Sequence, residues 1–408
     1  MLWDLSKIPG QDQILNNRPD YCIGIEGIGL SKTIAVLSKP DGTILGASSR
    51  PVGLSLFVTP RQEFRSELFG LLKDLAEETE LSLEAFSRAC VCFGLNGSTY
   101  SYSRDIELMS ELEKIKIKFG SIIIIHDLES AFISHAQSDT GLAVLCSCDS
   151  AYLGMNKGVS KYGGGWGPAL GDHGSGYMMG LAALRSVLRR YHFDSDARAL
   201  WEDIDRWYSD PTPRLTSKVG DWEEASMLWR QIRNRAQPQK HQSTRPDFLL
   251  SFAYEVARDV YSLRRWRSIV SSLTNPVIKA SDAGNFLAER IVEKTARKLS
   301  DGFEIFLRST TFEISPISLV LYGGVVTHNE TFCNRLKKDL GKVVHQVLGQ
   351  RPQIITLHDP GTMRPAIGCL MVALGGAGPG GVSLPCQTTL DAVKLSISGS
   401  GLEVLGND

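Results

Sequence analysis

The sequence predicts an α/β protein made of two similar domains around a central cleft. Its 408 residues exceed what one ordinary core holds but suit two cores. Apolar strand-like runs alternate with amphipathic helical stretches, and the same order of strand, turn and strand opens both halves. We expect an N-terminal extension over 1–20, domains over 21–135 and 136–374, an insertion at about 208–245 and a tail over 375–408.

The first half opens on a hairpin. Apolar runs at 21–25 and 32–37 flank the small-residue turn Glu26-Gly27-Ile28-Gly29-Leu30-Ser31, and Pro40-Asp41-Gly42 marks a second turn before a strand at 43–47. Apolar residues at helical spacing predict a helix over 62–78. Further buried strands are expected at 89–95, closed by Asn96-Gly97, and at 121–125, ending at His126-Asp127.

The second half repeats this order. A strand at 141–145, a turn from Cys146 to Ser150 and a returning strand at 151–155 mirror the first hairpin. Two such turns, facing each other across a cleft, would grip one phosphate chain. Chance similarity between hairpins is the other explanation. Beyond them we expect helical stretches at 175–191 and 248–307, a strand at 318–321, and helices at 330–340 and 365–374.

Composition favours a small-molecule partner. The 44 basic and 45 acidic residues leave a formal charge of −1, which favours neither a nucleic acid nor a membrane surface as the partner. The first nine residues hold no apolar core of signal-peptide length, and the apolar runs are too short to cross a bilayer, so we expect a cytoplasmic protein. The eight cysteines lack CxxC spacing and are expected to be mostly buried thiols.

The glycine-rich segment from Gly163 to Tyr177 is the most specific stretch of the chain. It reads Gly-Gly-Gly-Trp-Gly-Pro-Ala-Leu-Gly-Asp-His-Gly-Ser-Gly-Tyr. So many glycines around one Trp and one Asp are costly to order unless a backbone must approach a ligand closely. Asp172 or Ser175 is placed to cap a following helix, whose free amides would point at a polar or anionic group. A glycine-rich linker with a helix cap is the plainer explanation.

This segment resembles the sugar-binding signature of the N-acetylglucosamine kinases and of the related glucosamine kinases and activator ATPases. The likeness extends from about Tyr21 to Leu374 with landmarks in matching order. His126-Asp127 stands where the family has an Asn-Asp pair, Leu321 to Val325 resembles the adenosine motif, and Pro365 to Gly368 resembles the closing helix. The resemblance implies two duplicated actin-like, ribonuclease H-like domains around a cleft.

The resemblance also implies an activity, which is ATP-dependent phosphorylation of an amino sugar such as N-acetylglucosamine with Mg²⁺. Asp127 would be the general base that accepts the hydroxyl proton. The sugar would be held by Asn96, Gly97, Gly165, Trp166 and Asp172. The nucleotide would be held by Glu26, Gly27, Gly29, Ser31, Lys32, Cys148, Ser150, Gly323 and Gly324, with Glu26 binding the metal through water. A homodimer is an open expectation for the assembly.

Both phosphate-binding turns depart from the family. The first, Glu26 to Ser31, loses one glycine, a threonine and a basic residue, for which Lys32 is a displaced substitute. The second replaces Gly-Thr-Gly-Ser by Ser147-Cys148-Asp149-Ser150. Asp149 would place a carboxylate beside the phosphates, and two like charges ~4 Å apart cost several kcal/mol when partly desolvated. Only a bridging metal or a turned-away side chain would relieve this repulsion.

The sugar side departs less. No asparagine follows Gly53-Leu54-Ser55, where the family has a substrate-binding one. His126 replaces the family's asparagine; a lone histidine at a strand end is usually structural, and the alternatives are that it bonds substrate or shifts the titration of Asp127. Three interpretations therefore stay open: an amino-sugar kinase, a non-catalytic ligand-binding regulator of the same fold, and an enzyme turned to other chemistry on a sugar-like or anionic ligand.

Overall fold

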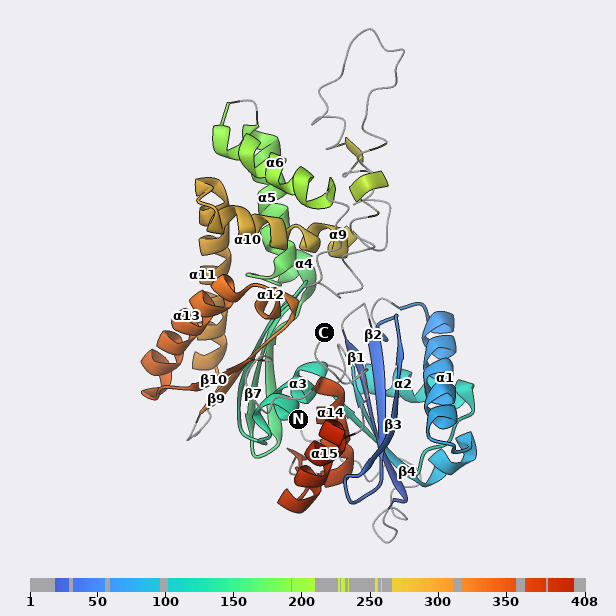
Figure 1. Cartoon of the computed structure of the whole chain (residues 1–408). Coiled ribbons are helices and arrows are strands. Elements are labelled where there is room, and N and C mark those ends of the chain that lie inside the picture. The colour runs from blue at the N-terminus through green and yellow to red at the C-terminus, as the bar shows by residue number, and fades with distance from the viewer. Residues whose placement is uncertain are drawn as a thin grey trace.

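The protein contains two five-stranded sheets of the same topology. The computed structural model describes residues 19–28, 32–55, 59–95, 102–191, 193–209, 266–310, 317–356, 364–378 and 381–399, together with 227, 229–231, 234, 254–255 and 258. The first sheet has the order β3-β2-β1-β4-β5 and the second β10-β9-β6-β7-β8, so the strands correspond in the order in which they occur along the chain. Figure 1 shows the two sheets side by side.

The strands fall where apolar runs meet turn residues. The first sheet comprises β1 (Tyr21–Ile28), β2 (Lys32–Ser38), β3 (Ile44–Arg50), β4 (Ala89–Gly94) and β5 (Ser121–Ile125). The second comprises β6 (Gly141–Cys146), β7 (Ser150–Asn156), β8 (Val159–Gly164), β9 (Ser318–Tyr322) and β10 (Gln353–Thr356). In each sheet the first three strands pair antiparallel and the last two join in parallel. The expected duplication is confirmed.

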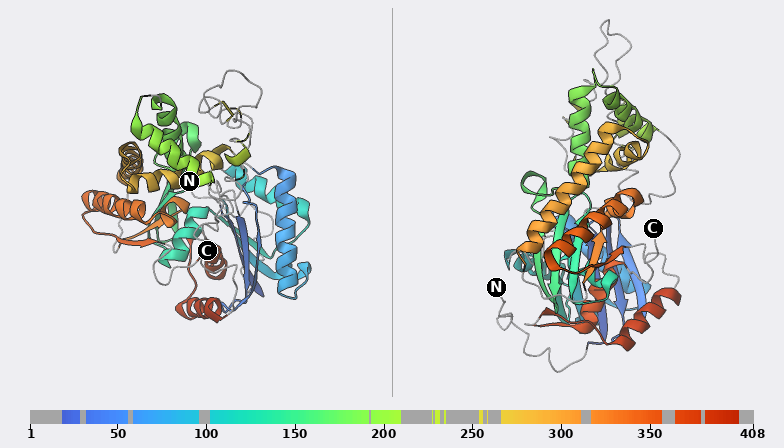
Figure 2. Two further views of the ribbon diagram at one scale, coloured as in Figure 1. Left: turned by 45° about the horizontal axis from the view of Figure 1, so that its top comes forward. Right: turned by 90° about the vertical axis from the view of Figure 1, so that its left-hand side faces the viewer.

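Helices cover the outer faces of both sheets. On the first sheet these are α1 (Arg61–Glu78) and α2 (Tyr102–Ile115). A 3₁₀ turn, Leu83–Arg88, comes directly before β4. On the second they include α5 (Gly176–Arg190), α11 (Phe286–Arg308) and α13 (Glu330–Leu348). Figure 2, right, looks onto the face that α11 and α13 cover. The remaining described helices of this half are α4 (Gly167–Leu170), α6 (Ser195–Ser209), α9 (Trp266–Ser272), α10 (Thr274–Asp282) and α12 (Gly324–Thr327).

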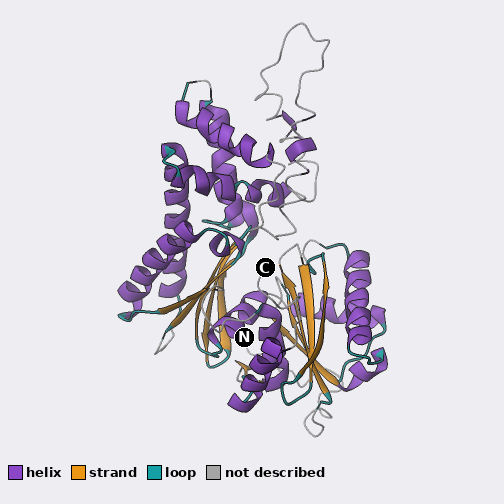
Figure 3. Cartoon of the chain, viewed as in Figure 1, coloured by secondary structure: helices purple, strands orange, loops and turns teal. Residues whose placement is uncertain are grey.

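A third core lies between the sheets and is closed by α3 (Asp127–Ala136) and α14 (Pro365–Gly375). Strand alternation divides the side chains: Ile23 and Ile25 face α1, whereas Cys22 faces inward. Likewise Leu142 faces the outer helices and Ala143 faces inward. The inner faces thus share one core with both helices, as the central helices in Figure 3 show.

The helices α3 and α14 cross with no side chain between their backbones. A Cβ at Gly368 would lie 2.0 Å from the Ser130 carbonyl oxygen, and a Cβ at Gly24 would lie 2.3 Å from the Leu370 nitrogen. Only glycine lets α14 lie this close to both α3 and β1. The crossing therefore fixes the start of α3, where Asp127 lies.

Two expectations needed extension. The predicted helix over 330–340 runs to Leu348 as α13, and part of the tail from 375 is ordered as β11 (Ala377–Gly378), β12 (Gly381–Val382) and α15 (Gln387–Gly399). Within the parts of the chain that are described, no helix is long and apolar enough to cross a membrane. The domain boundaries and the insertion at 208–245, most of which lies outside the described residues, stay predictions.

Candidate functional site

Asp127 occupies the first turn of α3, directly after β5. His126 is the residue before the helix, and it accepts a hydrogen bond from Leu128 N through Nδ1 at 3.1 Å while its own N–H donates to Glu129 at 2.9 Å. Glu129 also accepts a hydrogen bond from Ser160 on β8. These bonds satisfy the first amides of α3 and tie them to the second sheet. Asp127, which is buried, is therefore held by both halves of the fold.

His126 lies against the Asp127 carboxylate. Its Nδ1 is 2.6 Å from Asp127 Oδ1, and its ring lies 5.0 Å from that of Tyr162. Burial alone would lower the pKa of His126, but the neighbouring carboxylates of Asp127, Glu129 and Asp149 raise it above its ordinary value. A proton on Nδ1 would bond Asp127 and end the bond from Leu128. The protonation of His126 is thus coupled to the helix start.

Glu26 supplies a second buried carboxylate, from the end of β1. Its Oε2 has no hydrogen-bond partner among the described residues. Burial, then the nearby Cys369 and Asp127, raise the pKa of Glu26 well above its usual range, while Arg364 and the Ala366 backbone oppose the rise. The Glu26 carboxylate therefore lies within electrostatic reach of Asp127.

The rest of the first turn is only partly described. Gly27 packs closely against Leu54, since a Cβ there would lie 2.6 Å from the Leu54 carbonyl oxygen. Lys32 begins β2 and pairs with Ile28 across the hairpin. Gly29 and Ser31 lie outside the described residues.

Asp172 is the buried carboxylate of the glycine-rich segment. Its Oδ2 accepts from Arg267 Nη2 on α9 at 2.8 Å. The other oxygen, Oδ1, makes no regular hydrogen bond with the described residues. Burial and the nearby Asp149 raise the pKa of Asp172 to about 6, although Arg267 and the amides of Ser150 and Gly167 favour its charged form. Asp172 also has a positive φ of 54°, so its position is held by its surroundings.

The neighbours of Asp172 differ in exposure. Gly165 donates its N–H to the Ser150 carbonyl at 2.9 Å and has a positive φ of 71°. Trp166 precedes α4 and is 62% exposed, so an apolar surface lies open beside the segment. Ser175 caps α5 by accepting from Met178 N, as one of the two expected caps.

Backbone N–H groups of the second turn donate hydrogen bonds to other groups of the protein. Ser147 N donates to the Asp149 carbonyl at 2.9 Å. The Asp149 amide bonds its own side chain and favours the charged form of that carboxylate. The Ser150 amide bonds the Asp172 carboxylate and favours its charged form. The Ser150 hydroxyl donates to the His173 carbonyl at 3.0 Å. These donors would otherwise face a phosphate. The turn is thus bound to the glycine-rich segment.

Asp149 links the carboxylates into one site. Burial, then Asp127, raise its pKa, while Arg267 and His126 oppose the rise. Because Asp149 also raises the pKa of Asp172, one half-buried carboxylate lies near both Asp127 and Asp172. Asp127 and Asp172 therefore share one electrostatic neighbour, and their roles toward a sugar and a phosphate stay predictions.

The end of β9 completes the site. Gly323 has a φ of 116°, and a Cβ there would lie 2.5 Å from the Cys146 carbonyl oxygen, whereas a Cβ at Gly324 would meet only His328, at 3.9 Å. Gly323 thus backs the second turn and Gly324 borders open space. Burial, then Glu26, Asp127 and Asp149, raise the pKa of Tyr322 well above its usual range.

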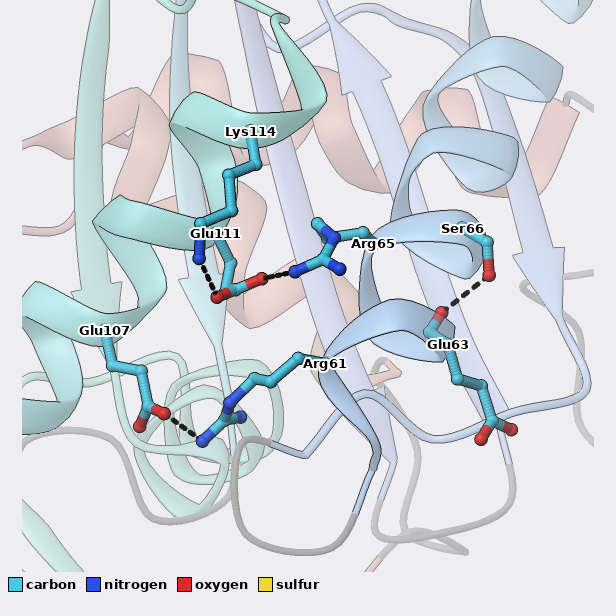
Figure 4. Close-up of polar contacts among 7 residues, drawn as sticks. All are labelled: Arg61, Glu63, Arg65, Ser66, Glu107, Glu111 and Lys114. Carbon is cyan, nitrogen blue, oxygen red and sulfur yellow. Dashed lines mark hydrogen bonds and ion pairs between the residues drawn. The ribbon is translucent and has the colours of Figure 1, made fainter.

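Asn96 and Gly97 lie outside the described residues, but the helix that follows them is clamped. Arg61 on α1 pairs with Glu107 on α2, and Arg65 Nη1 lies 2.6 Å from Glu111 Oε2, as Figure 4 shows. Lys114 Nζ adds a bond of 2.7 Å to the same buried carboxylate. Burial raises the pKa of Glu111, but these two cations outweigh it and the pKa is lowered. These ion pairs tie the middle and the last turn of α2 to α1.

The sequence analysis did not single out three charged groups of the site, Arg267, Arg364 and Glu129. Arg267 and Arg364 lower the pKa of site carboxylates, yet neither belongs to a local motif. The helix α3 did carry a signal, because Glu129 follows the polar strand end at the spacing of a capping box. Among the described residues, no group of three or more His, Cys, Asp or Glu side chains is arranged to hold a metal ion.

Comparisons with known proteins show the family to which the chain belongs. The model of the BadF/BadG/BcrA/BcrD ATPase family matches residues 23–373. An N-acetylmuramic acid/N-acetylglucosamine kinase of Clostridium acetobutylicum is 24% identical over 329 residues, which cover 78% of this chain and 90% of that protein. An N-acetyl-D-glucosamine kinase of Dictyostelium discoideum is 50% identical over 181 residues, 41% of this chain and about half (54%) of that protein.

A solved structure shows the same fold. It is described as a candidate N-acetylglucosamine kinase from Chromobacterium violaceum and is 18% identical in sequence. It matches 87% of this chain and 99% of its own with a TM-score of 0.54. The two duplicated domains are therefore those of the actin and hexokinase type.

Proposed function

Because the chain belongs to the BadF/BadG/BcrA/BcrD ATPase family, we propose that it transfers the terminal phosphoryl group of ATP to a hydroxyl of an amino sugar. The observation that carries this proposal is that two buried carboxylates, Asp127 at the start of α3 and Asp172 in the glycine-rich segment, each interact electrostatically with Asp149. One suits a general base and the other a sugar ligand. The named kinases among the relatives support the same substrate class.

The roles follow from where the groups lie. Asp172 has an oxygen free to accept a sugar hydroxyl, and Trp166 offers an apolar surface beside it. Asp127, held at the start of α3, would accept the proton of the attacking hydroxyl. The adenosine would lie against the backbone at Gly324, where, among the described residues, a Cβ would meet only the His328 ring, at 3.9 Å.

Magnesium fits the first turn. Glu26 has a buried oxygen without a partner, close to the charge of Asp127, and a hydrated cation would offset both carboxylates. Mg²⁺ keeps several of its waters and takes few protein ligands, which agrees with the lack of a described three-residue cluster. When bound, Mg²⁺ would neutralise charge on the phosphate oxygens.

The test is ADP release in the presence of MgATP with N-acetylglucosamine or N-acetylmuramic acid. The substitution Asp127→Asn removes the proton acceptor, so we expect turnover to fall by ~10²- to 10⁴-fold with sugar binding by calorimetry little changed. Asp301→Asn, on the exposed side of α11, is the matched control and should keep full turnover. Equal rates for the wild type and Asp127→Asn would contradict the role of the base.

A non-catalytic ligand-binding protein is the second candidate. It is favoured by the second turn, whose amides serve its own carbonyls and carboxylates. Calorimetry of MgATP with and without sugar separates the two functions. Mutually strengthened binding of both supports the kinase, and sugar binding without nucleotide binding supports the regulator.

A further inference from the structure

Arg267 lies where the glycine-rich segment meets the second turn. Its guanidinium donates from Nη2 to Asp172 Oδ2 at 2.8 Å. The amide of Ser150, at the end of the turn, bonds the same carboxylate and favours its charged form. Arg267 also lowers the pKa of Asp149, so its charge reaches the turn itself. One arginine thus lies between the expected sugar ligand and the expected phosphate turn.

The position of Arg267 is fixed by close packing of α9 on α5. A Cβ at Gly180 would lie 1.9 Å from the Val270 carbonyl oxygen, so the two backbones are in contact. Thr274, just after α9, donates its hydroxyl to the Gly176 carbonyl at 3.0 Å. Gly176 begins α5, four residues after Asp172. The helix that carries Arg267 is therefore attached to the site segment itself.

The guanidinium has donors to spare. Arginine carries five N–H groups. One of those of Arg267, on Nη2, donates to Asp172. Nε is buried without a hydrogen-bond partner among the described residues. A charged, buried donor without a hydrogen bond costs free energy, so a ligand that brings an acceptor would be bound more tightly. Such a planar, multiple donor matches phosphate oxygens.

The second turn lacks what Arg267 offers. Its amides at Ser147, Asp149 and Ser150 serve acceptors of the protein, and Asp149 adds a negative charge. A phosphate chain at this turn needs donors and a cation from another element. Arg267 is a described cation that bonds Asp172 and whose charge already acts on Asp149 in the turn.

Building on the proposed kinase function, we propose that Arg267 takes the place of the turn amides and donates to the terminal phosphate of ATP, while Asp172 holds the guanidinium in position. Arg267 is then a nucleotide-binding residue contributed by the helical part of the second half. It would also couple the sugar ligand to the phosphate, because Asp172 contacts both the guanidinium and the sugar.

The test compares MgATP with MgADP by calorimetry on the full chain. Arg267→Gln removes the charge and the fork, so we expect MgATP affinity to fall roughly ten- to a hundredfold and MgADP affinity to change by less than about threefold. Arg267→Lys keeps the charge without the fork and should retain part of the preference for ATP. Arg206→Gln, an exposed ion pair on α6, is the matched control and should behave as wild type.

The outcomes separate this inference from the proposed function. If Arg267→Gln weakens sugar binding but leaves the ratio of ATP to ADP affinity unchanged, Arg267 only positions Asp172 and the inference is wrong. A wild-type chain that binds sugar but neither nucleotide overturns the kinase and this inference together. Circular dichroism and a melting curve of both variants confirm that each is folded, and Arg267→Lys decides the case if the glutamine variant is not.

Discussion

The two hairpin turns join corresponding strands, yet they have become different sites. In each, three residues separate the last paired positions, Ile28 with Lys32 and Cys146 with Ser150. The first turn lies beside one carboxylate, Glu26, whose Oε2 has no partner among the described residues. The second lies beside Asp149 and Asp172 and is bonded to the glycine-rich segment. Duplication preserved the hairpins, while the segments packed against them determine which ligand atoms each can bind.

The largest expected effect tests how firmly the second turn is backed. Gly323→Ala places a Cβ 2.5 Å from the Cys146 carbonyl, at a φ of 116° that only glycine adopts readily. We expect a loss of ~3 kcal/mol in the free energy of unfolding, from strain and overpacking together. Urea denaturation measures it. Gly324→Ala, next to open space, is the control and should cost less than ~1 kcal/mol.

A smaller effect tests the charge that distinguishes the second turn. Asp149→Asn removes a carboxylate that raises the pKa of Asp172 and opposes a phosphate. We expect MgATP affinity to rise on the order of tenfold, with the sugar bound as before. Calorimetry compares it with Asp301→Asn. Weaker MgATP binding in Asp149→Asn would instead show that Asp149 assists the nucleotide, for example through the metal.

The smallest expected effect concerns His126, which lies against Asp127. Its pKa is raised in the folded protein above the ordinary 6.5, so its stabilisation is present below pH 6.5 and lost as the pH rises through the folded pKa. His126→Asn should remove this slope, a change of about 1 kcal/mol or less. Denaturation midpoints at pH 6 and pH 8 measure it.

The exposed His345→Asn on α13 is the control for that slope. It should leave the difference between the two midpoints as in the wild type. A slope between pH 6 and pH 8 that persists in His126→Asn would assign that pH dependence to a group other than His126. The pKa of Asp172, raised to about 6, predicts a loss of stability as the pH rises from about 4 to 6, below the window of His126.

The sequence predicted the features that repeat at short range. Apolar runs located β1 to β7 and β9 but not β8 or β10. Asp41-Gly42 lies in a hairpin turn, in which Gly42 has a positive φ of 94°. Asp127 and Asp172 were expected in one site and lie near a common neighbour, Asp149. The family resemblance, carried by local motifs, was confirmed by the family match.

Features set by distant parts of the chain were not predictable in this way. Arg267 meets Asp172 from 95 residues away, and no spacing rule links them. The use of the turn amides by Asp149 and Asp172 depends on side-chain directions that periodicity does not encode. The helix α15 was missed because its residues mix small, polar and apolar types without a clear apolar stripe.

The packing of α14 against β1 has a consequence for synthesis on the ribosome. Cys22, near the start of β1, bonds to the Ala373 carbonyl at 3.6 Å and shares a core with Val393 on α15. The inner face of β1 thus lacks its cover from α14 until translation has passed residue 375. A nascent chain of this protein therefore exposes apolar strands for most of its elongation, and chaperones that shield such surfaces have their longest opportunity to bind it before α14 emerges.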